Sequence, residues 1–333
     1  MKKLLVFIST FFILIFPGCR INNSESAMKK VRLNEVTRSI FYAPQYVAME
    51  LGYFKDENID LELVTGEGSD KTMTSILSSQ ADIGLLGSSS VISVCEQGKE
   101  HCPMIFAQLT KKDGSFLVGR EDDFEWSDLK GKEIIAGRKG GVPEMVFEYI
   151  LKSKGLDIIN DLTLLNNIQF NLMGMAFSRG IGDYVLLFEP TCSTLVKEKG
   201  YHKLKSLGKE CQNMVYTCYC ASEEYIDRNP KVIFKFTRAI YRAQLWVKSH
   251  SADEIARLII PYFIDLDYDL AKECVKNYLE SDVWSFTPMI NQDEFDLIQD
   301  VMIQAGELGY KIDMKKLVNN DYSLEVIKEF SEE

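Results

Sequence analysis

The chain has 333 residues, of which 46% are hydrophobic, and a formal net charge of −11. This length and apolar content suit about two ordinary globular domains and leave no room for large-scale disorder. Because an acidic surface is repelled by phosphate groups, nucleic acid and anionic lipid surfaces are excluded as electrostatic partners.

The beginning of the chain has the pattern of an export signal. Two lysines precede an uncharged apolar run, Leu4–Phe16, which is too short to span a bilayer. A glycine stands directly before Cys19, as in bacterial lipoprotein signals, in which the cysteine is acylated and becomes the first residue. We expect residues 1–18 to be removed, Cys19 to carry a lipid anchor and residues 19–30 to form a linker. An uncleaved membrane anchor is the alternative, and either form would work on the extracytoplasmic face of the cell membrane.

Seven further cysteines are an odd number, so they cannot all pair, and a core of this size does not need disulfides. Cys218 and Cys220 lie two residues apart on one face of a β-like run and are not placed to bridge each other. We expect most of the seven to be buried small hydrophobic side chains. They are Cys95, Cys102, Cys192, Cys211, Cys218, Cys220 and Cys274.

An α/β unit is predicted in the first part of the chain. A helix begins at Pro44 and ends at Gly52, and an alternating strand, Ile59–Val64, follows it. A second helix leads into a short apolar strand, Ile83–Leu86, and then into a glycine and three serines, Ser88 to Ser90. Polar loops that leave strand ends and open helices are where open α/β sheets bind small ligands.

The same order of elements returns later in the chain. The predicted elements are a strand at 134–136, a helix from Pro143 to Gly155, a strand at 162–165, a helix at 170–179 and a strand at 184–187. Pro44 lies 38 residues before Asp82, and the second proline lies 40 residues before Asp183. Both acidic residues precede a strand that contains two leucines, and in this register Ser88 matches Glu189. We infer two similar α/β lobes.

The last third of the chain is predicted to be helical. Helices are expected from Pro230 to Val247, from Ser251 to Ile260 and from Asn291 to Gly306. We expect this tail to return to the first lobe, which would then comprise residues 31–118 and 222–333, with residues 119–221 forming the second. The chain would cross between the lobes near 118–120 and 220–222. Two crossings make a hinge with a cleft between the lobes.

Several groups of residues resemble a known family. They are Gln45–Ala48, Leu51–Lys55, Asn58–Glu62, Gln80–Gly84 and Phe188–Pro190. Their order and spacing are similar to those of the solute-binding lipoproteins of ABC importers, in the branch for nitrate, sulfonates, taurine and pyrimidine precursors of thiamine. The resemblance runs from about Val31 to Ala305. It implies a two-lobed type II periplasmic-binding fold that closes around one small molecule and delivers it to a membrane permease driven by a cytoplasmic ATPase. We expect a monomer with no cofactor, no bound metal and no catalytic activity.

The resemblance assigns ligand contacts to loops of the first lobe. The expected residues are Ser39, Phe41, Tyr42, Gly66, Ser88, Ser89 and Ser90. The aromatic rings could stack on a planar solute, or they could only brace their loop. The serine hydroxyls and helix-start amides suit an anionic or carbonyl group, although one serine is expected only to cap its helix. The glycine-rich segment 66–72 lacks the glycine before lysine that a P-loop needs, so we interpret it as a ligand-facing loop.

In the second lobe the expected contacts come from Arg138, Gly140, Gly141, Val142 and Glu189. Arg138 could clamp an oxyanion or point to solvent. Glu189 could bind an amine or could satisfy the dipole at the start of its helix. The two charges predict different ligands, and a zwitterion such as taurine would use both. We favour a heteroaromatic or amine-bearing solute.

Two rival functions remain open. A pyrimidine synthase or a hydrolase would need a nucleophile–base pair or a metal cluster in the cleft. Cys95, His101 and Cys102 are weak metal candidates without a fourth ligand, and Thr217–Cys220 is only faintly similar to the cysteine-rich segment of pyrimidine synthases. The three histidines fall at helix ends or in surface-like segments, which disfavours an enzyme. A sensory receptor on the same fold is the second rival.

Overall fold

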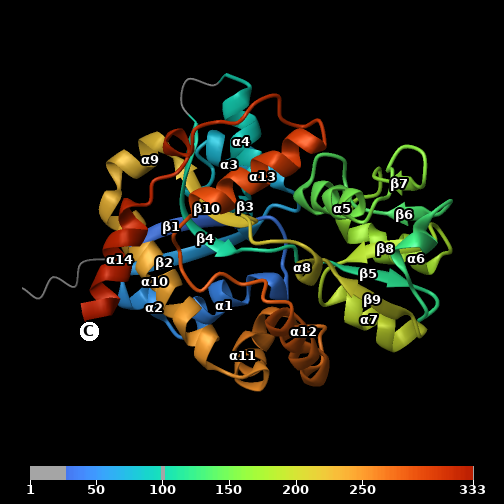
Figure 1. The fold of residues 1–333 in the computed structure, drawn as a ribbon. Coiled ribbons are helices and arrows are strands. Elements are labelled where there is room, and N and C mark those ends of the chain that lie inside the picture. The colour runs from blue at the N-terminus through green and yellow to red at the C-terminus, as the bar shows by residue number, and fades with distance from the viewer. Residues whose placement is uncertain (1–27, 99–101, 333) are drawn as a thin grey trace, which may run out of the picture.

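The computed structural model describes residues 28–98 and 102–332. The predicted export signal, Cys19 with most of the expected linker, and His101 lie outside the described residues. Two five-stranded sheets form the framework of the molecule (Figure 1). The first sheet has the order β2 (Ile59–Thr65), β1 (Lys29–Glu35), β3 (Ile83–Gly87), β10 (Thr217–Ser222) and β4 (Pro103–Thr110). The second has the order β7 (Thr163–Leu165), β6 (Glu133–Ile135), β8 (Tyr184–Leu187), β5 (Phe116–Gly119) and β9 (His202–Ser206). We call each sheet with its helices the first and the second lobe.

The two sheets repeat one arrangement, as the sequence spacing predicts. In each, three parallel strands are followed by an antiparallel strand, β10 in the first lobe and β5 in the second. Asp82 Oδ2 accepts the backbone N–H of Arg32 at 2.8 Å, and Asp183 Oδ2 accepts that of Glu133 at 2.9 Å. Each carboxylate therefore fastens the start of the third strand, β3 or β8, to the middle parallel strand, β1 or β6. The predicted repeat is confirmed, and its two acidic residues make equivalent contacts in the two lobes.

Helices cover both faces of the first sheet (Figure 1). The helices α1, α2, α10 and α11 lie on one side and α3, α4 and α13 on the other. The helices of this lobe are α1 (Ala43–Glu50), α2 (Tyr53–Asp56), α3 (Ser69–Leu77), α4 (Ser88–Glu96), α9 (Glu223–Arg228), α10 (Pro230–Ser249), α11 (Ala252–Ile259), α12 (Tyr268–Glu280), α13 (Gln292–Gln304) and α14 (Asp321–Glu332). The second lobe has α5 (Val142–Ser153), α6 (Met173–Ser178) and α7 (Thr191–Lys199), and α8 (Leu207–Glu210) lies between the lobes. Short 3-10 turns are η1 (Ile40–Tyr42), η2 (Trp126–Leu129), η3 (Phe170–Leu172), η4 (Ile260–Tyr262) and η5 (Met314–Lys316).

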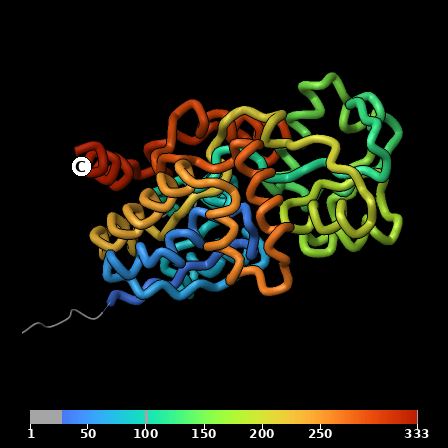
Figure 2. The backbone as a smooth tube through the Cα atoms, turned by 90° about the horizontal axis from the view of Figure 1, so that it is seen from below, coloured from blue at the N-terminus to red at the C-terminus, as the bar shows by residue number. Residues whose placement is uncertain are grey.

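The C-terminal third packs on the first lobe, as the sequence suggests. Helix α10 starts at Pro230 and buries one apolar stripe that includes Ile233, Phe236 and Val247. Within that stripe Gln244 Nε2 donates to the Gln108 carbonyl of β4 at 2.8 Å, which fixes the helix on the sheet. The predicted capping box of Ser251 opens α11. Both ends of the described chain consequently lie on the first lobe (Figure 2).

The chain crosses between the lobes at other positions than the sequence suggested. The expected crossings near 118–120 and 220–222 are wrong, because β5 pairs with β8 and β9 in the second sheet and β10 pairs with β3 and β4 in the first. The crossing segments are instead residues 111–115 and 207–216. Short apolar strands such as these fit either sheet, so their local sequence does not say which one they join.

The two crossing segments are joined by a buried hydrogen bond. Tyr216 OH donates to Asp113 Oδ2 at 2.7 Å, and the backbone N–H of Ser115 donates to Asp113 Oδ1 at 2.6 Å. Burial raises the pKa of Asp113 and of Tyr216. A Cβ at Gly208 would lie 2.6 Å from the Asp113 carbonyl oxygen, so the segments pass too closely for a larger residue. The two crossing segments therefore pass close to each other and are held together by a buried hydrogen bond.

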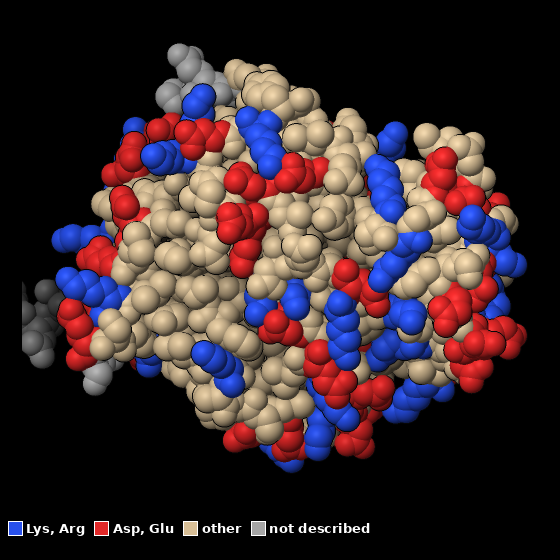
Figure 3. Space-filling view, in the orientation of Figure 1, with Lys and Arg blue, Asp and Glu red and all other residues tan. Residues whose placement is uncertain are grey.

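The cysteines depart from the prediction at one pair. Cys95 and Cys102 form a disulfide, so they are not metal ligands. The other five described cysteines are buried free thiols, as predicted, and burial raises the pKa of each. None of the described helices combines the length and the apolar character needed to cross a bilayer. On the face shown in Figure 3, acidic and basic side chains are interspersed over the second lobe without a continuous basic band.

Candidate functional site

A cavity of about 370 Å³ lies between the lobes, where the carboxyl ends of β1, β3, β6 and β8 meet. The segments that follow these strands form its wall: Val36 and Thr37 after β1, Gly87 at the end of β3, Ala136 after β6 and Phe188 after β8. This is the edge at which open α/β sheets hold ligands, because helices begin there and loops are free to vary. The two repeated units thus face each other across one cavity.

Three helices begin at the wall of this cavity. They are α3 at Ser69, α4 at Ser88 and α5 at Val142, and each is at least nine residues long. The starts of α4 and α5 meet across the cleft, since a Cβ at Gly87 would lie 2.8 Å from Cγ2 of Val142. Helix starts present unpaired N–H groups and the positive end of the helix dipole, so this convergence favours a ligand with negatively charged oxygens.

The three serines at the start of α4 have different surroundings. Ser88 is fully buried, its hydroxyl donates to the Val215 carbonyl and its N–H donates to the Tyr216 carbonyl at 3.2 Å. The geometry does not support the predicted ligand contact of Ser88, because this serine fixes the start of α4 to the crossing segment before β10 and does not line the cavity. Ser89 and Ser90 do line it, and their side chains have no hydrogen-bond partner among the described residues.

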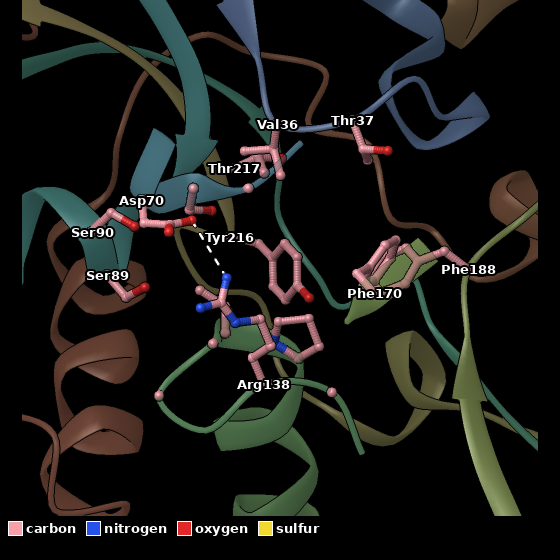
Figure 4. A pocket seen from close by; sticks show the side chains of 18 of the residues that line it. Val36, Thr37, Asp70, Ser89, Ser90, Arg138, Phe170, Phe188, Tyr216 and Thr217 are labelled. Carbon is pink, nitrogen blue, oxygen red and sulfur yellow. Dashed lines mark ion pairs between the residues drawn. The ribbon is translucent and has the colours of Figure 1, made fainter. Parts of the chain in front are cut away.

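Aromatic side chains form the other end of the cavity. The Phe41 ring packs edge-on against Phe188 and Tyr216, with centroid distances of 5.3 and 5.6 Å, and Phe170 lies 5.3 Å from Phe188. In Figure 4 Phe170 and Phe188 lie on one side of Tyr216, and the charged and serine side chains lie on the other. Phe41 lines the cavity and also braces its neighbours, so stacking of its ring on a planar solute stays a prediction.

Ser39 and Tyr42 both line the cavity, but they differ in whether their hydroxyl can donate a hydrogen bond to a ligand. The Ser39 hydroxyl accepts from Phe41 N–H at 3.2 Å and donates to the Glu189 carbonyl at 3.1 Å, so its proton is already used in a contact between the lobes. The Tyr42 hydroxyl has no hydrogen-bond partner among the described residues. Burial, with Glu35 nearby, raises the pKa of Tyr42, so this hydroxyl stays protonated and can donate to a ligand.

The predicted glycine-rich loop of the second lobe places Arg138 at the cavity. Arg138 Nη1 lies 3.6 Å from Asp70 Oδ1 at the start of α3, and this ion pair spans the cleft (Figure 4). Both side chains are more than half exposed, so the pair is weak and a ligand anion can compete for the guanidinium. Gly140, with φ of +73°, brings the loop so close to the first lobe that a Cβ would lie 3.0 Å from Glu307 Oε2. Lys139 also lines the cavity and adds a second cation.

The predicted ligand contact of the Glu189 carboxylate is not supported by its geometry. Its oxygens accept from Ser193 N–H at 2.9 Å, from Ser193 Oγ at 2.8 Å and from Asn277 Nδ2 at 2.7 Å, and Lys203 Nζ lies 3.3 Å away. The side chain is fully buried between α7 and α12 and does not line the main cavity. The alternative, a carboxylate that satisfies the start of its helix, describes Glu189 correctly. The reason to favour an amine-bearing ligand is thereby removed.

Gly66 also lies away from the main cavity. A Cβ there would lie 2.5 Å from Asn34 Oδ1 and 2.7 Å from Thr72 Oγ1, so the glycine allows close packing behind the cavity wall. The same loop reaches the cavity further on, at Gly68, Ser69 and Asp70, which agrees with its interpretation as a ligand-facing loop. Seventeen lining residues were not predicted individually as ligand contacts: Val36, Thr37, Gly68, Ser69, Asp70, Gly87, Ser93, Ala136, Gly137, Lys139, Pro143, Phe170, Met173, Leu186, Phe188, Tyr216 and Thr217. Of these, only the residues in or beside a predicted ligand loop could have been identified from the sequence.

Behind the loop of Arg138, the first turn of α5 carries a buried carboxylate. Glu144 is 2% exposed and its Oε2 accepts the Gly140 N–H at 3.2 Å. Burial, with the negative charge of Glu148 nearby, raises the pKa of Glu144 to about 7. The loop is therefore held from behind by a group that titrates near neutral pH. The described lining residues of the cavity include no histidine or cysteine, and the described residues contain no cluster of three metal-ligating side chains.

Comparison with known proteins gives three relevant matches. The family model described as NMT1/THI5 like matches residues 40–253. "Putative binding protein YtlA" of Bacillus subtilis (strain 168) is 42% identical over 323 residues, which covers 96% of each chain. The 4-amino-5-hydroxymethyl-2-methylpyrimidine phosphate synthase of Candida albicans (strain WO-1) is 25% identical over 229 residues, 63% of this chain and 64% of that protein.

Among solved structures, the periplasmic aliphatic sulphonate binding protein SsuA from Escherichia coli matches with a TM-score of 0.68. The match covers 86% of this chain and 96% of that one at 16% sequence identity. At this identity the likeness shows the fold alone. The predicted two-lobed periplasmic-binding fold is confirmed.

Proposed function

This chain belongs to the NMT1/THI5-like family, and we propose that it is the extracytoplasmic solute-binding component of an ABC importer. Its ligand is a small organic anion with a flat apolar body. The family relationship and the empty space of suitable size between two lobes support a binding role, since drug-sized ligands occupy cavities of about 300–1,000 Å³.

The convergence of three helix starts on one end of the cavity carries the ligand assignment. Ser89 and Ser90 add free hydroxyls at this end, and Arg138 and Lys139 add positive charge. Asp70 is the one carboxylate among the described lining residues, and it faces Arg138. A carboxylate or sulfonate group at this end would receive amide, hydroxyl and guanidinium hydrogen bonds together.

The side chains at the opposite end of the cavity determine which kind of ligand body fits there. Phe41, Phe170 and Phe188 offer ring faces and edges that suit a planar or aliphatic group. The Tyr42 hydroxyl supplies one further donor. A bare inorganic anion would leave this apolar wall unoccupied, so an organic anion makes better use of the whole cavity.

Ligand capture would close the two lobes, and the closed form would be the form that the permease recognises. We propose lobes of residues 29–110 with 217–332 and of residues 116–206, which move about the link between Asp113 and Tyr216. A lipid on Cys19 would hold the protein, as a monomer, at the membrane where the permease lies. No chemical step is required, so the ligand would be released unchanged.

A thermal-shift series tests this assignment, because a ligand that binds only the folded chain raises its unfolding temperature. The probes are benzenesulfonate, benzoate, taurine, 4-aminopyrimidine and the neutral benzamide. The two aromatic anions should stabilise the chain, and benzamide should not. In Arg138→Gln the affinity for the two aromatic anions should fall at least tenfold, about 1.4 kcal/mol, and the rise in unfolding temperature should shrink accordingly.

Arg179→Gln is the matched control, since Arg179 is exposed and lines no part of the cavity. Equal stabilisation by benzamide and benzoate, or full binding by Arg138→Gln, would overturn the anion assignment. Chromatography of the released ligand addresses catalysis separately. A changed ligand would show an enzyme in place of a binding protein.

A further inference from the structure

A second, smaller cavity of about 170 Å³ lies beside the main one. The two share six lining residues: Thr37, Ser39, Phe170, Met173, Leu186 and Phe188. We propose that this second compartment is a subsite for another oxygen-acceptor group of the same solute, held by Arg38. The solute is then a bipartite molecule, with one acidic group at the helix starts, an apolar body beside the aromatic rings and a second carboxylate or sulfonate beyond them. This inference rests on the proposed function.

Arg38 is held in a fixed position at the wall of the second compartment. Its Nε donates to Glu35 Oε1 at 2.8 Å, and its guanidinium lies 5.5 Å from the centre of the Tyr46 ring. Its two terminal nitrogens have no partner among the described residues. A guanidinium fixed through Nε presents its other edge as a two-pronged donor, which matches the two oxygens of a carboxylate or sulfonate.

Glu35 is the positioning residue for this guanidinium. Its side chain is fully buried and accepts from Gln45 Nε2 and Tyr46 OH, each at 2.8 Å, and from Thr65 Oγ1 at 3.2 Å. With three neutral donors around it, the carboxylate cannot follow Arg38 if the arginine moves. Arg38 is 37% exposed and lines the compartment, while its Nε is anchored to Glu35.

The remaining wall of the compartment adds donors. Thr191 begins α7, and Asn171 contributes an amide. The side chain of Thr191 has no hydrogen-bond partner among the described residues. Glu189 also borders this space, but its carboxylate is occupied by Ser193 and Asn277, and Lys203 offsets its charge. Arg38, although paired with Glu35 through Nε, is the charged residue of this wall whose terminal nitrogens have no hydrogen-bond partner among the described residues.

The acid end of the main cavity, the aromatic wall and the second compartment adjoin one another. Figure 4 shows Arg138, Ser89 and Ser90 on one side of Tyr216 and the rings of Phe170 and Phe188 on the other. Both rings belong to both cavities, so the second compartment begins where the aromatic wall ends. A ring held beside this wall would direct a substituent on its far side toward Arg38.

Isothermal titration calorimetry with matched probe pairs tests the subsite. The pairs are benzenesulfonate with 4-sulfobenzoate and naphthalene-2-sulfonate with 6-sulfo-2-naphthoate. In at least one pair the added carboxylate should tighten binding by tenfold or more. Arg38→Gln should remove this advantage and leave the affinity for the parent sulfonate within about twofold. Arg38→Lys should retain part of the advantage, because it keeps the charge but loses the two-pronged edge.

Thr191→Val is a second variant that leaves the contact of Glu35 with Arg38 intact, and it should reduce the advantage about threefold. Arg179→Gln, with the same charge change at an exposed site, should behave as wild type. Equal affinity within both probe pairs, or an advantage that survives in Arg38→Gln, would overturn the subsite. Binding of the parent sulfonates that depends on Arg138 would then still support the proposed function. If none of the four probes binds, both proposals fail.

Discussion

Replacing Glu189 with alanine should destabilise the fold strongly and leave ligand affinity unchanged. The carboxylate is fully buried and accepts four hydrogen bonds, two from Ser193, one from Asn277 and a weaker one from the Cys274 thiol, with Lys203 3.3 Å away. In the alanine variant these donors lose their acceptor, and the lysine keeps a partly buried positive charge without its partner. The variant therefore tests whether Glu189 joins α7 to α12 or binds the ligand.

The magnitude follows from these contacts. Removing one member of a buried ion pair costs about 3–5 kcal/mol, and each stranded buried donor costs about 1–3 kcal/mol. Lys203 is 21% exposed and can turn partly toward water, so we take about 3 kcal/mol as the expected loss. Glu189→Gln should lose less of the free energy of unfolding, because the amide oxygen still accepts hydrogen bonds. A part of the loss remains, since the NH₂ group faces the other donors.

Urea unfolding followed by tryptophan fluorescence measures the loss, and calorimetry with benzenesulfonate measures affinity at a temperature where both variants are folded. The expected result is a lower unfolding midpoint with an affinity within about twofold of wild type. An unchanged unfolding midpoint together with tenfold weaker ligand binding would show that Glu189 does not join α7 to α12. Glu189 would then face the ligand.

Three further variants test other parts of the site. Glu144→Gln should reduce the pH dependence of stability. A carboxyl whose pKa is raised to about 7 binds its proton more tightly in the folded chain, so its contribution, up to about 3 kcal/mol, is lost in the wild type between pH 4.5 and 7, and the variant keeps only the dependence due to other buried carboxyls such as Asp113. Parallel slopes of unfolding temperature against pH in the two proteins would contradict this. Asp70→Asn should tighten benzenesulfonate binding about threefold, because it frees Arg138 from an exposed ion pair, and weaker binding would show that Asp70 itself holds the ligand. Gly114→Ala places a Cβ 2.4 Å from a ring carbon of the buried Phe41 and should cost about 1–3 kcal/mol in thermal unfolding. A melting temperature equal to that of wild type would mean that this ring can move.

The features that the sequence predicted correctly are local. Pro44 and Pro143 stand in the first turn of their own helices. Asp82 and Asp183 each accept a backbone N–H from the strand next to their own. Their spacing is therefore enough to predict the repeat and, with it, the positions of most loops that line the cavity. The position of Ser89 and Ser90 at a helix start follows from the same pattern.

The features that the sequence missed depend on distant partners. The direction of the Glu189 carboxylate is decided by Asn277, 88 residues away, and by Lys203 on β9. Ser88 is turned from the cavity by the carbonyl of Val215, 127 residues away. Arg38 likewise becomes notable only when Glu35 is seen to be buried among side chains of other elements. Residue type and spacing do not contain these contacts.

A crystal structure of the chain with the tightest-binding aromatic anion of the series would show directly whether the acid group of the ligand binds at the helix starts. We expect an acid group within hydrogen-bond distance of the amides of Ser89 and Ser90 and of the Arg138 guanidinium. The ring should lie against Phe41 and Phe188. A ligand bound outside the cleft, or one whose acid group points away from the starts of α4 and α5, would contradict it.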